Sequence, residues 1–216
     1  MRAEHPEAIY HAMARGNNRQ AVFHRADDYD QFLRVLLSVK AKQPFKLYGY
    51  CLMTNHIHLL LQPETGSSLS AIMQRLLGIY ATHHNQRYDC EGHVWKSRFY
   101  SRIITDDIYA LRVLAYVDLN PVRARLCVAA HDYVWSSARA HLLKHRDPCL
   151  DPYPLLGQAE RQQAYQDLLV ECGSQRDATL EFRLGRGRPK NSSDEFPTTV
   201  STGYPQIRQT NYSKEG

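Results

Sequence analysis

The stretch Phe45–Gln62, FKLYGYCLMTNHIHLLLQ, holds two apolar runs that are separated by a short polar pair. Runs of this length, rich in aromatic and aliphatic residues and broken by turn formers, predict a β-hairpin. We expect its strands over Phe45–Leu52 and His56–Gln62, with the turn at Thr54-Asn55. The rest of the sheet is expected to form around this hairpin.

Two histidines mark one side of the second strand. Successive side chains on a strand point to opposite faces, so His56 and His58 share a face and lie about 7 Å apart along the chain. The aliphatic residues between and after them face a core: Ile57, Leu59 and Leu61. Two neutral imidazoles on one face can share a divalent ion. Such a pair can also lie on an exposed sheet face or be hydrogen-bonded in the interior. Further candidate ligands elsewhere in the sequence must therefore decide whether it binds a metal ion.

Apolar spacing and capping residues predict further elements on either side of the hairpin. They are a strand Ile9–Arg15, a helix Ala26–Lys42, a helix from Ser67 or Ser68 to Arg87, a strand Arg98–Ile104, and a helix from Asp106 to Asn120 that Pro121 closes or kinks. The order strand, helix, strand, strand, helix, strand is the ferredoxin-like pattern. It predicts an α+β fold whose mostly antiparallel sheet has helices on one face and leaves the other face to a ligand.

Composition bounds the class of protein. The chain has 216 residues, and 43% of them are hydrophobic, which suits one domain with appendages. We expect that domain over residues 1–140, a helical extension over 141–182 with a helix at Arg161–Cys172, and a basic, disordered tail over 183–216. No transmembrane run or signal segment is visible, and the five cysteines form no CxxC pair. These features predict a cytoplasmic protein without a membrane partner, a zinc ribbon or a disulfide framework.

The charge balance favours a nucleic-acid partner. The net charge is +5, and 14 tyrosines accompany 27 lysines and arginines. Basic side chains hold phosphates, and aromatic rings stack on unpaired bases. Tyrosine is also a common strand residue, so composition alone is a weak argument.

The helix after the fourth strand carries two kinds of surface. At 100° per residue one arc is apolar, with Ile108, Leu111, Leu114, Ala115 and Leu119. A second arc, expected to be exposed, holds Tyr109, Arg112, Tyr116 and Asn120. An ordinary amphipathic helix would look the same. Combined with the two histidines, however, this arc offers neutral ligands that leave the charge of a divalent ion free to polarise a phosphate, and a phenol that can attack phosphorus.

Four segments resemble the single-tyrosine HUH transposases and, within them, the REP-associated tyrosine transposases. They are YHAMARGNNR at 10–19, NHIHLL at 55–60, GHVWKSRFY at 92–100 and YVDLNPVRA at 116–124. The resemblance implies a Mg²⁺ or Mn²⁺ ion held by His56, His58 and Asn120, with Tyr116 as the nucleophile. It also implies single-stranded DNA substrates, namely hairpins from repeated extragenic palindromes, and a location at the nucleoid.

Two regions are predicted to contact this DNA. In the loop Arg15–Arg19, the two arginines flank a Gly-Asn-Asn turn whose backbone can approach phosphates. This turn includes Asn17. An aromatic and basic cluster follows later in the chain: Trp95, Lys96, Arg98 and Phe99. Core packing is the alternative for Trp95. Further predicted DNA contacts are Arg112, Arg123, Arg186 and Arg188, the last two in an AT-hook-like run.

Other candidate residues receive a different interpretation. Tyr100 and Tyr109 are alternative nucleophiles, and we expect Tyr100 to be structural or to stack on a base. His83, His84 and His93 are expected to be surface residues beside the nucleic acid.

Three functions compete on this evidence. The leading one is a metal-dependent enzyme that nicks and rejoins single-stranded DNA through a phosphotyrosine. The others are a non-catalytic hairpin DNA- or RNA-binding protein of the same fold, and a metal-dependent hydrolase that uses water. A monomer is preferred, and a homodimer stays open.

Overall fold

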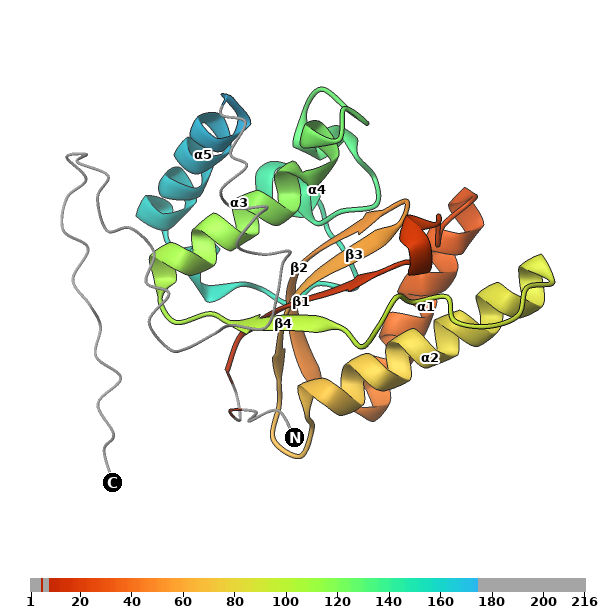
Figure 1. Cartoon of the computed structure of the whole chain (residues 1–216). Coiled ribbons are helices and arrows are strands. Elements are labelled where there is room, and N and C mark those ends of the chain that lie inside the picture. The colour runs from red at the N-terminus through yellow and green to blue at the C-terminus, as the bar shows by residue number, and fades with distance from the viewer. Residues whose placement is uncertain (1–4, 6–7, 175–216) are drawn as a thin grey trace, which may run out of the picture. The chain divides into compact units, whose positions relative to one another are not determined.

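The computed structural model describes residue 5 and residues 8–174, which belong to a compact unit spanning residues 1–176. Its elements are β1 (Tyr10–Arg15), η1 (Asn17–Arg19), α1 (Ala26–Lys42), β2 (Phe45–Met53), β3 (His56–Pro63), α2 (Leu69–Tyr88), β4 (Tyr100–Ile103), α3 (Asp107–Arg123), η2 (Ala130–Asp132), α4 (Ala138–Leu143), η3 (Pro154–Gly157) and α5 (Ala159–Ser174), as shown in Figure 1. None of the helices in this part of the chain is both long and apolar enough to cross a membrane. The predicted tail over 183–216 lies outside the described residues.

The four strands form one sheet in the order β2-β3-β1-β4, and every neighbouring pair is antiparallel. The central strand β1 lies between the hairpin and β4. Together with the element order, this topology confirms the predicted α+β, ferredoxin-like fold.

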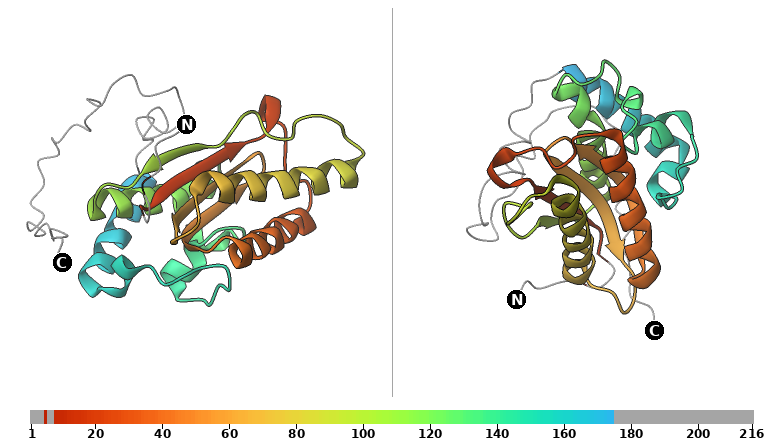
Figure 2. Two further views of the ribbon diagram at one scale, coloured as in Figure 1. Left: turned by 90° about the horizontal axis from the view of Figure 1, so that it is seen from below. Right: turned by 90° about the vertical axis from the view of Figure 1, so that its right-hand side faces the viewer.

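Helices cover the two faces of the sheet unequally. α1 and α2 lie side by side on one face (Figures 1 and 2), where they pack on Ile57, Leu59 and Leu61, each fully buried. The alternation along β3 predicted this core. α3 lies on the other face, close to β2, because Gly49 has no side chain: a Cβ there would lie 2.7 Å from Cδ1 of Leu114. The face that was expected to be open to a ligand is therefore partly covered by α3.

The segment after α3 protects the outer edge of β2. The backbone N–H of Leu52 donates to the carbonyl of Trp135, and that of Ser137 donates to the carbonyl of Tyr50, each at 2.9 Å. Pairing of this kind hides hydrogen-bonding groups that an edge strand would otherwise expose. α4 and α5 then pack with α3 through a small apolar cluster that includes Leu119.

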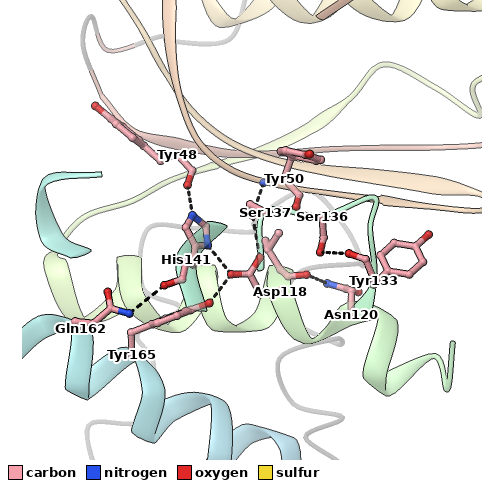
Figure 3. A network of polar contacts seen from close by, with 11 residues as sticks. Tyr48, Tyr50, Asp118, Asn120, Tyr133, Ser136, Ser137, His141, Gln162 and Tyr165 are labelled. Atoms are coloured by element: carbon pink, nitrogen blue, oxygen red, sulfur yellow. Dashed lines mark hydrogen bonds and ion pairs between the residues drawn. The ribbon is translucent and has the colours of Figure 1, made fainter. Parts of the chain in front are cut away.

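A buried carboxylate joins these elements (Figure 3). Asp118 on α3 is fully buried and accepts hydrogen bonds from Ser137 Oγ at 2.9 Å, from His141 Nδ1 at 2.7 Å, and from the hydroxyl of Tyr165. The other ring nitrogen of His141 lies 2.9 Å from the carbonyl oxygen of Tyr48 on β2. One side chain of α3 is thus tied to β2, α4 and α5.

Helix starts follow the predicted caps. Ser68 Oγ accepts from Ala71 N at 3.2 Å, and Asp106 Oδ1 accepts from Tyr109 N at 2.8 Å. α3 continues to Arg123 with Pro121 inside it, so the proline does not close the helix.

One residue of the predicted apolar arc is misplaced. Ile108 is 50% exposed, because burial along α3 begins only at Ala110.

Candidate active site

Three histidines meet on the face of the sheet that α3 covers. His56 and His58 alternate along β3 as predicted, and their rings stand nearly perpendicular with centroids 5.0 Å apart. His11 on β1 joins them: its Nε2 lies 2.9 Å from Nδ1 of His58, and both residues are 1% exposed. In the strand register His11 stands opposite Leu60, which places it diagonally across from His58 on the same face.

The amide of Asn55 orients His56. His56 Nδ1 lies 2.7 Å from Asn55 Oδ1, and Asn55 Nδ2 donates to the carbonyl oxygen of Arg19 at 3.2 Å. Because a carbonyl can only accept, the second bond fixes which end of the amide is the oxygen. His56 therefore donates its Nδ1–H to Asn55, and its Nε2 keeps a lone pair.

Burial keeps the three imidazoles neutral. Desolvation and then the charge of Arg15 lower the pKa of His56 to about 4. Desolvation and then the charge of Arg102 lower the pKa of His11 to about 4. Burial lowers the pKa of His58 well below its ordinary value. A neutral imidazole can bind a metal ion without first releasing a proton.

Asn120 on α3 lies beside His56, and its polar side chain raises the pKa of that imidazole, against the lowering by burial. Pro121 helps to aim this amide. A proline has no N–H for the carbonyl four residues earlier, which here is that of Val117. Asn120 Nδ2 donates to the carbonyl of Tyr116 at 2.9 Å and, more weakly, to that of Val117 at 3.5 Å. With the amide nitrogen held by the helix, the amide oxygen is left for the site.

Tyr116 lies directly beside the histidines. Its ring stands edge-on to that of His58, with centroids 5.6 Å apart, and 6.3 Å from that of His11. The guanidinium carbon of Arg123 lies 5.2 Å from the Tyr116 ring centroid. Tyr116 is only 7% exposed, so its predicted exposure is wrong; the sheet, and not solvent, faces this residue of α3, whereas Arg112 on the same arc is exposed.

The two alternative tyrosines are engaged elsewhere. Arg102 on β4 donates from Nε to the hydroxyl of Tyr100 at 2.6 Å and also interacts with Tyr109. Tyr116 is thus the candidate nucleophile whose ring contacts are with His58 and His11.

The donor set suits a divalent ion. His58 Nε2 is buried and has no hydrogen-bond partner among the described residues. His56 gives its Nδ1–H to Asn55 and Asn120 gives its amide N–H to the helix, so two acceptors are left where these side chains meet. A cation there would satisfy them. No cluster of three His, Cys, Asp or Glu side chains that could hold a metal occurs within the described ranges; the set found here has two imidazoles and one carboxamide.

The two predicted DNA-contact regions lie side by side at one edge of this site. The N–H of Lys96 donates to the carbonyl of Arg15, and the N–H of Asn17 donates to that of Val94, each at 2.8 Å. Gly16 is required here, because a Cβ would lie 2.4 Å from the carbonyl oxygen of Gln20. Arg15 stands opposite His56 in the strand register and is exposed.

The remaining predicted contacts are placed as follows. Trp95 is half-buried against the core and donates its indole N–H to the carbonyl of Leu77 at 3.0 Å, as the packing alternative states. The other cationic contacts Arg19, Lys96, Arg98 and Arg112 are exposed, Arg123 is half-buried, and Arg186 and Arg188 lie outside the described residues.

The three extra histidines do not behave alike. His93 is exposed and His83 is half-buried. His84 is 5% exposed, so its predicted surface position is wrong: α2 turns it inward, with its Nε2 3.3 Å from Nε2 of His24.

Neither His11 nor Asn55 was predicted as a member of the site. Both stand inside motifs that were recognised, YHAMAR and NHIH. Asn55 directly precedes the histidine pair, which is a usable signal. His11 becomes a neighbour of His58 only through the register of β1 on β3, which no local pattern specifies.

The comparisons agree with this architecture. The model of a family described as IS200-like transposases matches residues 5–120, which is more than half of the chain. The chain belongs to the IS200-like transposase family. The resemblance to REP-associated tyrosine transposases that the motifs indicated is confirmed at the level of family and fold.

Two individual relatives support this. A Haemophilus influenzae protein described as a REP-associated tyrosine transposase is 29% identical over 122 residues, covering 51% of this chain and 65% of the relative, or just under two thirds of its length. A solved structure of a REP-associated tyrosine transposase bound to a REP hairpin matches with a TM-score of 0.57 and 15% identity, over 71% of this chain and 90% of that one. At such identity the structural likeness establishes the fold.

Proposed function

We propose that the protein nicks and rejoins single-stranded DNA beside hairpin repeats, with Tyr116 as the nucleophile. The observation that carries the proposal is the edge-on contact of Tyr116 with His58, 5.6 Å between ring centroids, in a buried cluster of neutral imidazoles. The hairpin bound in the solved structure of similar fold supports the choice of substrate class. Membership of a transposase family supports the choice of reaction class.

The proposed reaction exchanges one phosphate ester bond for another. The Tyr116 oxygen attacks a backbone phosphorus, a Tyr–O–P bond forms, and the P–O bond to the departing strand breaks. That strand leaves as a free hydroxyl, which takes the proton that the phenol has lost. A hydroxyl of the same or another strand reverses the step, so no nucleotide cofactor is consumed.

His56, His58 and Asn120 would hold a divalent ion, Mg²⁺ or Mn²⁺, which polarises the phosphate when bound. The chain itself supplies orientation. Asn55 fixes the ring of His56, Pro121 and the helix carbonyls fix Asn120, and the Asp118 contacts fix the rotation of α3.

The test uses a hairpin oligonucleotide from the genomic repeats, with a single-stranded flank labelled on both sides of the junction. In Mn²⁺ or Mg²⁺ the wild type should form a covalent adduct that survives a denaturing gel. Tyr116→Phe should form none and still bind the hairpin, because it loses one oxygen only. The fully paired form of the same sequence should not be cut, since stacked bases cannot splay apart at the site.

Controls separate the competing functions. Tyr109→Phe removes the same atom from the same helix and should keep the adduct. Cleavage that leaves no adduct would indicate a hydrolase, and binding without cleavage by the wild type would indicate a non-catalytic protein. An adduct on the Tyr116→Phe variant would refute the assignment of the nucleophile.

A further inference from the structure

The contact between His58 and His11 joins two ring nitrogens, and one of them must carry the proton. Nδ1 of His58 lies 2.9 Å from Nε2 of His11, and the ring planes are 16° apart with centroids at 5.2 Å. If His11 donates, the His58 proton sits on Nε2, which has no acceptor among the described residues and could not bind an ion. If His58 donates, the proton without an acceptor lies instead on Nδ1 of His11, and Nε2 of His58 presents a lone pair toward the site.

The second arrangement matches what Asn55 does for His56. There the Nδ1–H is donated to an acceptor whose orientation is fixed, and Nε2 is left free. Paired acceptors behind both rings would leave two Nε2 lone pairs facing one ion. Partners behind metal-bound imidazoles commonly select the tautomer and hold the ring plane in this way.

His11 is well suited to this task. It lies on the central strand β1, is 1% exposed, and packs edge-on against the Tyr116 ring, with centroids 6.3 Å apart. A carboxylate in its place would add negative charge behind the ligand and reduce the attraction of the ion for a phosphate. A neutral acceptor orients His58 and leaves the charge of the ion undiminished.

We propose that His11 is a positioning residue that accepts the Nδ1–H of His58 and thereby holds His58 in the ion-binding tautomer. This rests on the proposed function, because it presumes a divalent ion at His56 and His58. In this role His11 acts through His58 and need not contact the ion or the DNA.

The test measures Mn²⁺ affinity of the full chain by the electron spin resonance of free Mn²⁺, without DNA. His11→Leu, which cannot accept a hydrogen bond, should weaken Mn²⁺ binding by about 10- to 100-fold. His11→Gln can place an amide oxygen where Nε2 stood and should recover most of the affinity. His83→Leu removes a half-buried histidine of α2, on the other face of the sheet, and should bind as the wild type does. Urea unfolding of each variant shows that it is folded.

A second measurement does not depend on affinity or activity. In the Mg²⁺-loaded protein, the ¹⁵N shifts of the imidazoles should show the proton of His58 on Nδ1 and an unprotonated Nε2 on His11. A proton on Nε2 of His11 would overturn the proposal.

The outcomes separate this proposal from the proposed function. If His11→Leu binds Mn²⁺ as tightly as the wild type, or if His11→Gln is as weak as His11→Leu, the positioning role fails while the metal site stands. If the wild type binds Mn²⁺ no better than His58→Ala, the metal site itself fails and the role of His11 fails with it.

Discussion

Arg123 lies against the ring of the candidate nucleophile Tyr116, and its hydrogen bonds are incomplete. Its Nη2 donates to the carbonyl of Cys172 at 3.4 Å, whereas its Nε and Nη1 are buried without a partner in the described part of the chain. Unpaired buried donors are costly. We expect these donors to pair with a phosphate of a bound DNA strand, since a guanidinium fork matches phosphate oxygens.

We therefore expect Arg123→Gln to slow adduct formation under single-turnover conditions by about 100-fold, the typical cost of one preorganised donor at a reacting group. Arg123→Lys keeps the charge but not the forked guanidinium, and its rate of adduct formation should fall between those of the wild type and Arg123→Gln. Arg125→Gln removes the same charge from an exposed position at the end of the same helix and should react as the wild type does. Equal rates for Arg123→Gln and Arg125→Gln would exclude this role.

At the scale of elements, the rotation of α3 about its axis decides whether Tyr116 and Asn120 face the histidines. Asp118 lies between them in sequence and points the opposite way, into the contacts drawn in Figure 3. Both ring nitrogens of His141 face acceptors, the Asp118 carboxylate and the Tyr48 carbonyl, so the ring is suited to carry both protons. Burial disfavours that charge, but the Asp118 carboxylate and the two hydrogen bonds outweigh it and raise the pKa of His141.

A raised pKa makes the contribution of His141 to stability depend on pH. It is fully present below the ordinary value of 6.5 and is lost as the pH rises through the raised pKa of the folded state. The free energy of unfolding of the wild type should therefore exceed that of His141→Gln most at acid pH. The difference should shrink at higher pH, by no more than about 1.4 kcal/mol per pH unit.

Urea titrations from pH 5 to about 9 measure this difference, within the range where the histidine charge changes. His145→Gln, at an exposed histidine of the same segment, should show no such trend. A gap between wild type and His141→Gln that is constant with pH would mean that His141 is neutral in the folded state.

The same elements show what the sequence could predict. The alternation along β3 and the caps Ser68 and Asp106 are local signals, so the hairpin and the helix starts were predictable. The pairing of His11 with His58 and that of Asp118 with Tyr165 each join residues 47 positions apart. Such contacts depend on strand register and helix packing, which local patterns do not specify.

At the scale of the whole molecule, one chain supplies every member of the candidate site. The histidines come from β1 and β3, and Tyr116 and Asn120 come from α3, all within one compact unit. α3 is held to its own β2 by two routes, the Asp118 contacts and the close approach at Gly49. Exchange of α3 between two copies would first have to separate Asp118 from its own partners, and the same buried network would then have to re-form against the second copy.

We therefore expect each molecule to react with its own tyrosine. Tyr116→Phe and His58→Ala each lack one half of the site, and a mixture of the two should form no covalent adduct with the hairpin substrate. In an assembly that shares α3 between copies, the intact tyrosine of one variant would meet the intact histidines of the other, and the mixture would regain activity. A denaturing gel of the mixture, beside the wild type at equal concentration, measures this directly. Recovery of adduct in the mixture would show that α3 leaves its own sheet, and that the Asp118 contacts form between molecules as well as within one.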